Sequence, residues 1–219
     1  MNFNDYIRSK KVAIVGPAEY MTGCNLGQEI DSHDVVVRIN RSIELCEKYK
    51  DDIGERTDIL YSCLIEKSAN AGKINPDSYK SLGIEWVCIP PKSSIQGIAV
   101  DNSISEYASN SKLIKLKEVV KTRVVDYKLN NKIANKIMCR PNTGYIAIFD
   151  LLNSNPSQLS IYGFSFYLDG FMKGCKSGIE QEANMTEIQY TDKCFNSGRH
   201  IQKNMWNHAK ESLLFHKKV

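Results

Sequence analysis

The sequence predicts an α/β fold: a single Rossmann-like domain whose mostly parallel sheet is flanked by helices. Short apolar runs rich in β-branched residues recur along the chain, at 12–15, 34–40, 59–64, 84–89 and 159–164. Stretches with helical spacing of apolar residues lie between several of these runs. A parallel sheet covered on both faces has strands of this continuous apolar kind, because neither face meets water.

The composition is that of an ordinary globular protein, with 42% hydrophobic and 25% charged residues. No linker or internal repeat interrupts the 219 residues, so we expect 1–219 to form a single domain. The net charge of +4 is mild. It favours a small anion such as a nucleotide and gives no reason to expect nucleic-acid binding.

The sequence also bears on compartment and metal binding. No apolar run approaches the length of a membrane span, and the first residues contain no apolar signal core. The cysteines number seven and include no C-x-x-C pair, which indicates neither a disulfide framework nor a zinc site. We therefore expect a cytoplasmic protein without a bound metal, and peripheral contact with a membrane stays open.

The stretch 11–41 has a strand, loop, helix, strand pattern. Gly16 and Pro17 stop the first apolar run, and Thr22 is placed to cap a helix before the run at 34–40. The first loop of such a unit lies at the carboxyl edge of the sheet, where helix amides attract phosphate. The pattern thus predicts a nucleotide site near this loop. Its glycines do not have the G-x-G-x-x-G spacing, so a loop whose glycines serve packing is the alternative.

The detail of this stretch resembles the large sialylmotif of the eukaryotic-type sialyltransferases, glycosyltransferase family 29. The motif continues through I-D-S-H-D-x-V-x-R-x-N, and the matching positions are Gly27, Ile30, Asp31, His33, Asp34, Val36, Arg38 and Asn40. A following family segment, Val-Gly-x-(Lys/Arg)-Thr, has its counterpart at 53–57. The resemblance implies that Asn40 and the loop at Gly16 contact the CMP part of a donor. Pro17 stands where relatives carry asparagine.

The middle of the chain has weaker patterns. We expect a helix at 42–50, a short helix after Pro76, a loop at 93–110, an amphipathic helix at 113–125, and either a helix or a strand entry at 130–139. Arg123 and Lys128 are candidates for lining a substrate cleft. A solvated surface is the alternative for both side chains.

A second motif begins at Arg140. A P-x-T-G turn leads into an apolar helix at 145–153, and a strand ending in Tyr-Gly-Phe follows. Thr143 and Gly144 therefore lie at a helix N-terminus, which attracts anions. The string resembles the small sialylmotif of the same family, and this implies that Asn142, Thr143 and Gly144 bind CMP.

Among the four histidines, His200 is the candidate catalytic residue. It opens an expected helix at 201–213, and a helix N-terminus disfavours imidazolium, which keeps a neutral base available. A structural histidine is the alternative, as we expect for His33, which is placed to hold a loop together. The resemblance implies that His200 is the general base of the family's His-x4-Glu motif, with Met205 in place of the glutamate.

The family also carries an aromatic motif whose histidine assists the departing phosphate. The local string at 189–192 has no histidine, so Tyr190 could donate a hydrogen bond there, or Arg199 could supply charge. The segment 166–188 is rich in Gly, Ser and Asn and is a candidate lid or acceptor loop. A plain surface loop is the alternative.

The resemblance implies the GT-A-like fold variant of family 29 and an inverting transfer. A CMP-activated acidic sugar would be the donor substrate, a glycan or glycolipid the acceptor, and no metal or cofactor would be needed. Animal members join their two long motifs by a disulfide. The corresponding positions here are Val12 and Pro156, as a reducing compartment allows.

Three alternatives to a sialyltransferase remain. One is transfer of another CMP-linked ulosonic acid such as Kdo. The second is a catalytically weak CMP- or glycan-binding pseudoenzyme, which Pro17 and Met205 favour. The third is an unrelated Rossmann oxidoreductase, and the lack of an acidic residue after the second strand argues against it.

Overall fold

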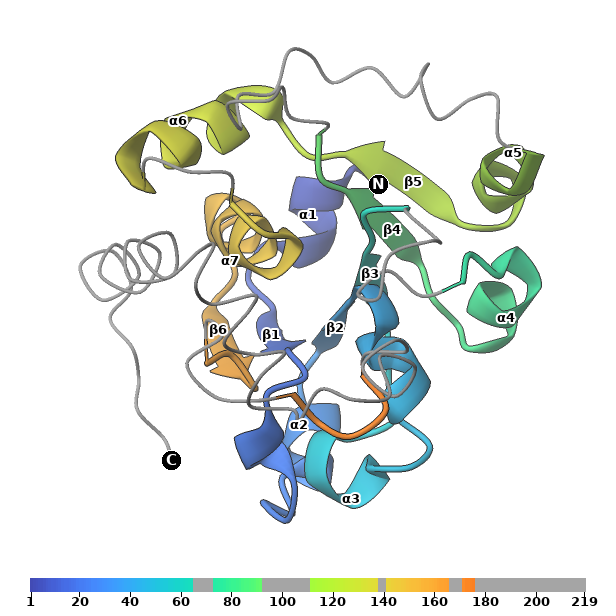
Figure 1. Ribbon diagram of the computed structural model, residues 1–219. Coiled ribbons are helices and arrows are strands. Elements are labelled where there is room, and N and C mark those ends of the chain that lie inside the picture. The colour runs from blue at the N-terminus through green and yellow to red at the C-terminus, as the bar shows by residue number, and fades with distance from the viewer. Residues whose placement is uncertain (65–72, 92–110, 138–140, 166–170, 176–219) are drawn as a thin grey trace, which may run out of the picture.

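The structure is a computed structural model that describes residues 1–64, 73–91, 111–137, 141–165 and 171–175. Six parallel strands form its one sheet in the order β5-β4-β3-β2-β1-β6 (Figure 1). The strands are β1 (Lys11–Val15), β2 (Val35–Ile39), β3 (Ile59–Tyr61), β4 (Trp86–Ile89), β5 (Lys121–Val124) and β6 (Gln158–Tyr162). The predicted α/β class and parallel sheet are confirmed.

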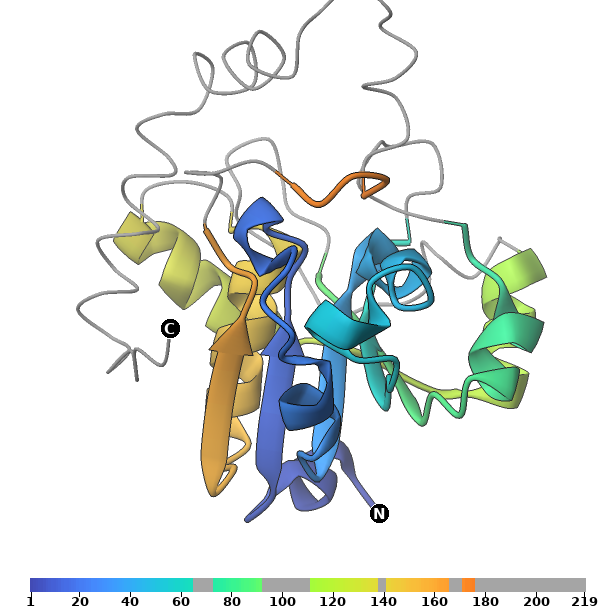
Figure 2. The ribbon, with the colours of Figure 1, turned by 90° about the horizontal axis from the view of Figure 1, so that it is seen from below.

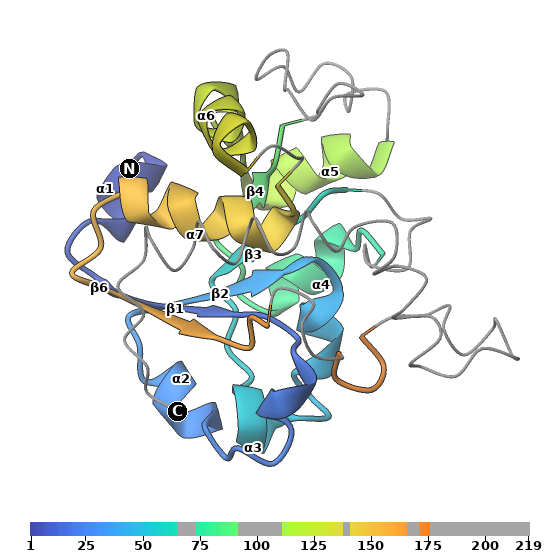
Figure 3. The same ribbon diagram turned by 60° about the vertical axis from the view of Figure 1, so that its left-hand side comes forward.

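Helices cover both faces of the sheet, which explains why its strands are apolar throughout (Figure 3). One face packs against α1 (Phe3–Ile7), α6 (Tyr127–Ile137) and α7 (Thr143–Asn153). The other face packs against α2 (Gly27–Asp31), η2 (Asn40–Leu45), α3 (Lys50–Ile53), α4 (Pro76–Ser81) and α5 (Ser111–Val119). Successive strand residues enter opposite layers, as Val35 and Val36 do in β2.

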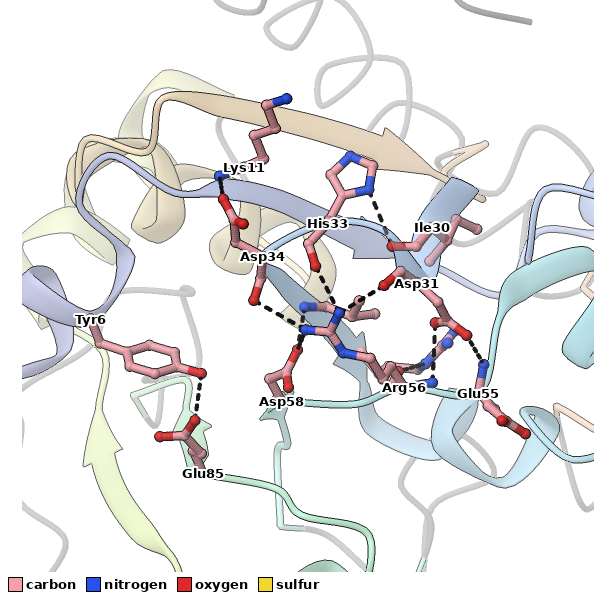
Figure 4. Close-up of polar contacts among 12 residues, drawn as sticks. Tyr6, Lys11, Ile30, Asp31, His33, Asp34, Glu55, Arg56, Asp58 and Glu85 are labelled. Carbon is pink, nitrogen blue, oxygen red and sulfur yellow. Dashed lines mark hydrogen bonds and ion pairs between the residues drawn. The ribbon is translucent and has the colours of Figure 1, made fainter. Parts of the chain in front are cut away.

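Arg56 connects the end of α2 to the starts of strands β2 and β3 (Figure 4). Its guanidinium donates to the carbonyl oxygens of Asp31, His33 and Asp34 at 2.7, 2.8 and 3.0 Å. It also forms an ion pair with Asp58 at 2.7 Å. The Asp31 carboxylate in turn accepts the backbone amides of Glu55 and Arg56. The turn at 54–56 is therefore held by two charged residues, Arg56 and Asp31, and Asp31 belongs to the large motif.

Three helix predictions are corrected by the structure, for local reasons. Thr22 does not cap a helix, because Asn25 has a left-handed φ of 54° that interrupts the chain and α2 begins only at Gly27. Thr22 instead ends the short 3-10 helix η1 (Glu19–Met21). The expected helix at 113–125 ends at Val119, and the β-branched residues beyond it form edge strand β5. The stretch 42–50 is not a continuous helix: the 3-10 helix η2 ends at Leu45, and α3 begins at Lys50.

Other expected elements are placed as follows. In the stretch 130–139, left open between helix and strand, residues 130–137 belong to helix α6, and 138 and 139 lie outside the described residues. The helix after Pro76 and the apolar helix after the P-x-T-G turn are confirmed as α4 and α7. The loop at 93–110 and the helix at 201–213 lie outside the described residues. Within the described part of the chain, no helix combines the length and apolar character that crossing a bilayer requires.

A buried ion pair attaches the edge strand β5 to α7. Arg123 donates two hydrogen bonds to the carboxylate of Asp150, at 2.7 and 2.9 Å, and the hydroxyl of Tyr61 donates to the same carboxylate at 2.5 Å. Burial opposes the charge on Arg123, but the hydrogen bonds and charge of Asp150 outweigh it and raise the pKa of Arg123. Burial and the Asp150 charge raise the pKa of Tyr61 well above its usual value. Arg123 is thus structural, and its prediction as a cleft residue is wrong.

We predict that Asp150→Asn destabilises the protein by about 3–5 kcal/mol, since it leaves the Arg123 guanidinium buried without a carboxylate. Asp77→Asn is the matched control, because it breaks a 2.6 Å ion pair with Lys115 whose side chains are 71% and 52% exposed. It should cost less than about 1 kcal/mol. Urea denaturation measures both values, and an equally small loss for both variants would contradict the role of the buried pair.

Candidate functional site

The sheet has a topological switch point between β1 and β6. The chain moves from β1 outward through β5 on one side and returns to the other side of β1 as β6. In open α/β sheets, ligands bind outside the carboxyl ends of the strands at such a point. Figure 2 shows this edge at the top, beneath η1 and the segment 171–175. The residues predicted to bind a nucleotide are therefore expected to lie at this edge of the sheet.

The two motifs meet at the switch point through the backbones of Gly16 and Gly163. The amide of Gly16 donates to the carbonyl of Tyr162 at 2.8 Å, and the amide of Ala18 donates to the carbonyl of Gly163 at 3.1 Å. A Cβ on either glycine would collide with the carbonyl oxygen of the other. Gly163 also has a φ of +68°, which disfavours other residues. Glycine is therefore required on both strands.

The N-terminus of α7 packs against the end of β6. The ring of Phe164 lies 2.6 Å from the place where a Cβ on Gly144 would stand, so a larger residue would displace the ring. Asn142 is the N-cap, and its side-chain oxygen accepts the amide of Tyr145 at 2.8 Å. Thr143 and Gly144 are consequently the first residues of an 11-residue helix. The helix dipole gives this end a partial positive charge, which suits a phosphate.

Asn40 lies at the carboxyl end of β2, the strand next to β1. Its φ of 47° is left-handed, a conformation that asparagine tolerates better than most residues. Its side-chain oxygen accepts the backbone amide of Cys63 at 2.9 Å, which ties the end of β2 to the end of β3. Among the residues that the structure describes, the side-chain amide nitrogen of Asn40 has no acceptor. It is thus placed to donate to a ligand.

The loop after β1 has little hydrogen-bonding capacity left for a phosphate. The amides of Gly16 and Ala18 are bonded to β6 and its end, and Pro17 has no amide proton. The carbonyl of Pro17 accepts the amide of Met172 at 2.9 Å, and Ala18 forms a bridge with Phe171. Gly16 and Pro17 therefore shape the edge of the site, whereas the available amides belong to the α7 terminus.

Tyr20 is a residue at this edge that sequence reasoning missed. Its hydroxyl accepts the backbone amide of Phe164 at 3.1 Å, although its side chain is 48% exposed. The bond connects η1 of the first motif to the strand end of the second. Tyr20 lies in a loop without periodicity, so only its exposed aromatic character could have drawn attention to it.

Most large-motif residues stabilise the scaffold beneath the site. The ring of His33 bonds to the carbonyls of Glu29 and Ile30 and to the hydroxyl of Ser160 at 3.0 Å, which confirms that it holds a loop together. Asp34 accepts the amide of Lys11 at 2.8 Å. Arg38 is fully buried and donates to the carbonyls of Ile53 and Arg56. Of the matching motif positions from Gly27 to Asn40, Asn40 is the one that follows β2 at the edge of the site.

The predicted catalytic residues cannot be placed in this geometry. His200, Tyr190, Arg199 and Met205 lie outside the described residues, as does most of the predicted lid at 166–188. Lys128 is exposed on α6. The described groups that this edge of the sheet offers are the neutral amides of Asn40, at the end of β2, and of Thr143 and Gly144, at the start of α7. They can bind an anion through dipoles and hydrogen bonds, with no cationic side chain among them.

Comparisons with known proteins agree with this arrangement. The model of glycosyltransferase family 29 (sialyltransferase) matches residues 4–169. A Mus musculus protein, alpha-N-acetylgalactosaminide alpha-2,6-sialyltransferase 2, is 31% identical over 97 residues, which are 44% of this chain and 24% of that protein. The chain thus aligns with about a quarter of the length of this relative.

Two solved structures have the same fold. One is a mammalian sialyltransferase in complex with Gal-beta-1-3GalNAc-ortho-nitrophenol, with a TM-score of 0.51 and 14% identity over 95% of this chain and 69% of that one. The other is a mammalian sialyltransferase with a TM-score of 0.52 and 15% identity over 93% of this chain and 66% of that one. At this identity the likeness establishes the fold alone.

We predict that Gly163→Ala destabilises the protein by about 3–5 kcal/mol, because a left-handed φ and a backbone collision add together. Gly83→Ala is the control, since its φ of +73° is similar but an added Cβ would meet nothing within 4 Å. It should cost about 1–2 kcal/mol. Chemical denaturation compares the two, and equal losses would mean that the close approach of the two motifs is not a steric constraint.

Proposed function

Because the chain belongs to glycosyltransferase family 29, we propose that it is a sialyltransferase-type enzyme. It moves an acidic sugar from a CMP-activated donor to the hydroxyl of a glycan or glycolipid acceptor, with inversion at the anomeric carbon. One observation carries the proposal: the two family motifs, about a hundred residues apart in sequence, converge at the switch point through Gly16 and Gly163. Their convergence puts Asn40 and the α7 terminus at one sheet edge.

The nucleotide half of the reaction rests on the described residues. The amides of Thr143 and Gly144, which have no acceptor among the described residues, would meet the phosphate charge that develops on CMP as the sugar leaves. The side-chain amide of Asn40 adds a donor whose position is fixed by its bond to Cys63. Since fixed dipoles stabilise the leaving phosphate, the proposed reaction needs no metal and no cofactor.

The transfer step needs a base and help for the leaving group. We assign the base to His200, which removes the proton from the acceptor hydroxyl as that oxygen attacks the anomeric carbon. Tyr190 would donate a hydrogen bond to the departing phosphate. Both assignments rest on motif position in the sequence.

A second candidate function is CMP or glycan binding without efficient catalysis. The first loop favours it, because Pro17 has no amide proton and the amides of Gly16 and Ala18 are already bonded, so residues 16–18 offer no backbone donor to a phosphate. Met205 in place of the motif glutamate favours it as well. Turnover separates the two functions: incubation with CMP-sialic acid and with CMP-Kdo against acceptor panels should release CMP and form a glycoside with one donor. Binding without product would establish the second function.

We predict that His200→Ala lowers turnover at least about a hundredfold and leaves CMP affinity nearly unchanged, as expected for a general base that does not touch the nucleotide. Initial rates and calorimetric titration measure the two quantities. If turnover survives the substitution, His200 is not the base, and His208→Ala becomes the informative variant. A parallel loss of CMP affinity would show that His200 binds the donor instead.

We predict that Asn40→Ala and Asn40→Asp both weaken CMP binding at least about tenfold, because both remove the side-chain donor and the aspartate also repels phosphate. The two variants differ in stability. Aspartate keeps an oxygen that accepts the Cys63 amide, whereas alanine loses it at a cost of about 1–3 kcal/mol. Unchanged CMP affinity in Asn40→Asp would remove Asn40 from the site.

A further inference from the structure

The basic residues of this chain are concentrated around the edge strand β5. Residues 111–137, which form α5, β5 and α6, contain eight lysines and arginines and two acidic residues, a net charge of +6. The whole chain carries +4, so the remainder is net negative. Within the described part of the chain, the β5 end of the sheet therefore carries a concentrated positive charge (Figure 1).

Part of this charge is already neutralised by partners. Arg123 is bound to Asp150 in the interior, Lys115 pairs with Asp77 and Lys121 lies 3.9 Å from Glu85. The lysines of α6 differ from these. Within the described part of the chain, none of the three takes part in an ion pair, and α6 itself contains no acidic residue.

The α6 lysines form a single exposed row. Lys128, Lys132 and Lys136 are all exposed and follow each other at intervals of four residues, about 6 Å along the helix axis. The opposite face of α6 is buried through Asn130, Ile133, Ala134 and Ile137. Like charges four residues apart destabilise a helix, so the row is not explained by the stability of α6.

We propose that the row Lys128, Lys132 and Lys136 docks the protein on the surface of a membrane that contains anionic lipid. A lysine carries a compact point charge on a long, flexible side chain. A plane of anionic lipid headgroups attracts a row of such charges without requiring a particular orientation of each ammonium group. Nucleic acid is disfavoured as the occupant because the row holds no arginine fork, which planar phosphate recognition favours, and the chain as a whole is only mildly basic.

The position of α6 would bring a docked membrane close to the candidate site. α6 ends at Ile137, and the α7 terminus with Thr143 follows within a few residues, so the basic row and the candidate site are close neighbours in the chain. Figure 2 shows α6 toward the carboxyl edge of the sheet. A membrane held at α6 would concentrate a lipid-linked acceptor near this edge. The docking itself does not depend on the proposed reaction.

Vesicle cosedimentation of the full chain tests the proposal. The wild-type protein should sediment with vesicles of phosphatidylcholine and phosphatidylserine at low salt, not with phosphatidylcholine alone, and added salt should release it. Each lysine near an anionic surface strengthens partitioning by about fivefold, so replacing all three with glutamine should weaken binding about a hundredfold. Glutamine keeps a strong helix propensity, and circular dichroism verifies that the variant is folded.

A matched control separates the row from net charge. Lys50, Lys73 and Lys80 are exposed elsewhere on the chain, and their replacement by glutamine removes the same charge. This variant should bind anionic vesicles within about threefold of wild type, since surface potential falls off within a Debye length. Equal loss in the two triple variants, or no wild-type binding, would overturn the proposal. So would tighter binding to RNA or duplex DNA than to vesicles with the same loss in the α6 variant.

Discussion

The close approach of Gly16 and Gly163 is the constraint on which the rest of the structure depends. Because neither residue has room for a Cβ, β1 and β6 can end side by side with their loops in contact. That contact brings the Phe164 ring onto Gly144 and so fixes the start of α7 at the same edge. A side chain at either glycine would separate two motifs that are adjacent only in three dimensions.

The two motifs contribute differently to the fold and to the candidate site. The large motif is mostly structural: Asp31, His33 and Asp34 hold the turns around β2, and Arg38 is buried among backbone carbonyls. Hydrogen bonds to charged groups contribute about 1.5–3 kcal/mol each, so these residues are needed for the fold before any ligand is present. The small motif supplies the helix terminus, whose first two amides have no acceptor among the described residues. Asn40 belongs to the first motif and lies at the same carboxyl edge of the sheet as the start of α7.

The parts of this account that the sequence predicts are those governed by local pattern. β-branched runs identified five of the six strands, and the P-x-T-G turn located the start of α7. Edge strand β5 was missed because helical spacing of apolar residues runs up to Val120, and the strand is stabilised by Arg123 and its distant partner Asp150. The loss of phosphate donors in the first loop was equally hidden, since it depends on bonds from Gly16 and Ala18 to β6. Tyr20 was missed for the same reason: its partner Phe164 is far away in the sequence.

Calorimetric titration of the purified protein with CMP, CDP, UMP and NAD, without added metal, tests the central claim most directly. The claim is that the switch-point edge is a site for the CMP part of a donor. It predicts binding of CMP in preference to UMP and NAD, with an affinity that does not change when a chelator is present. A folded protein that binds none of these nucleotides, or that prefers NAD, would contradict it.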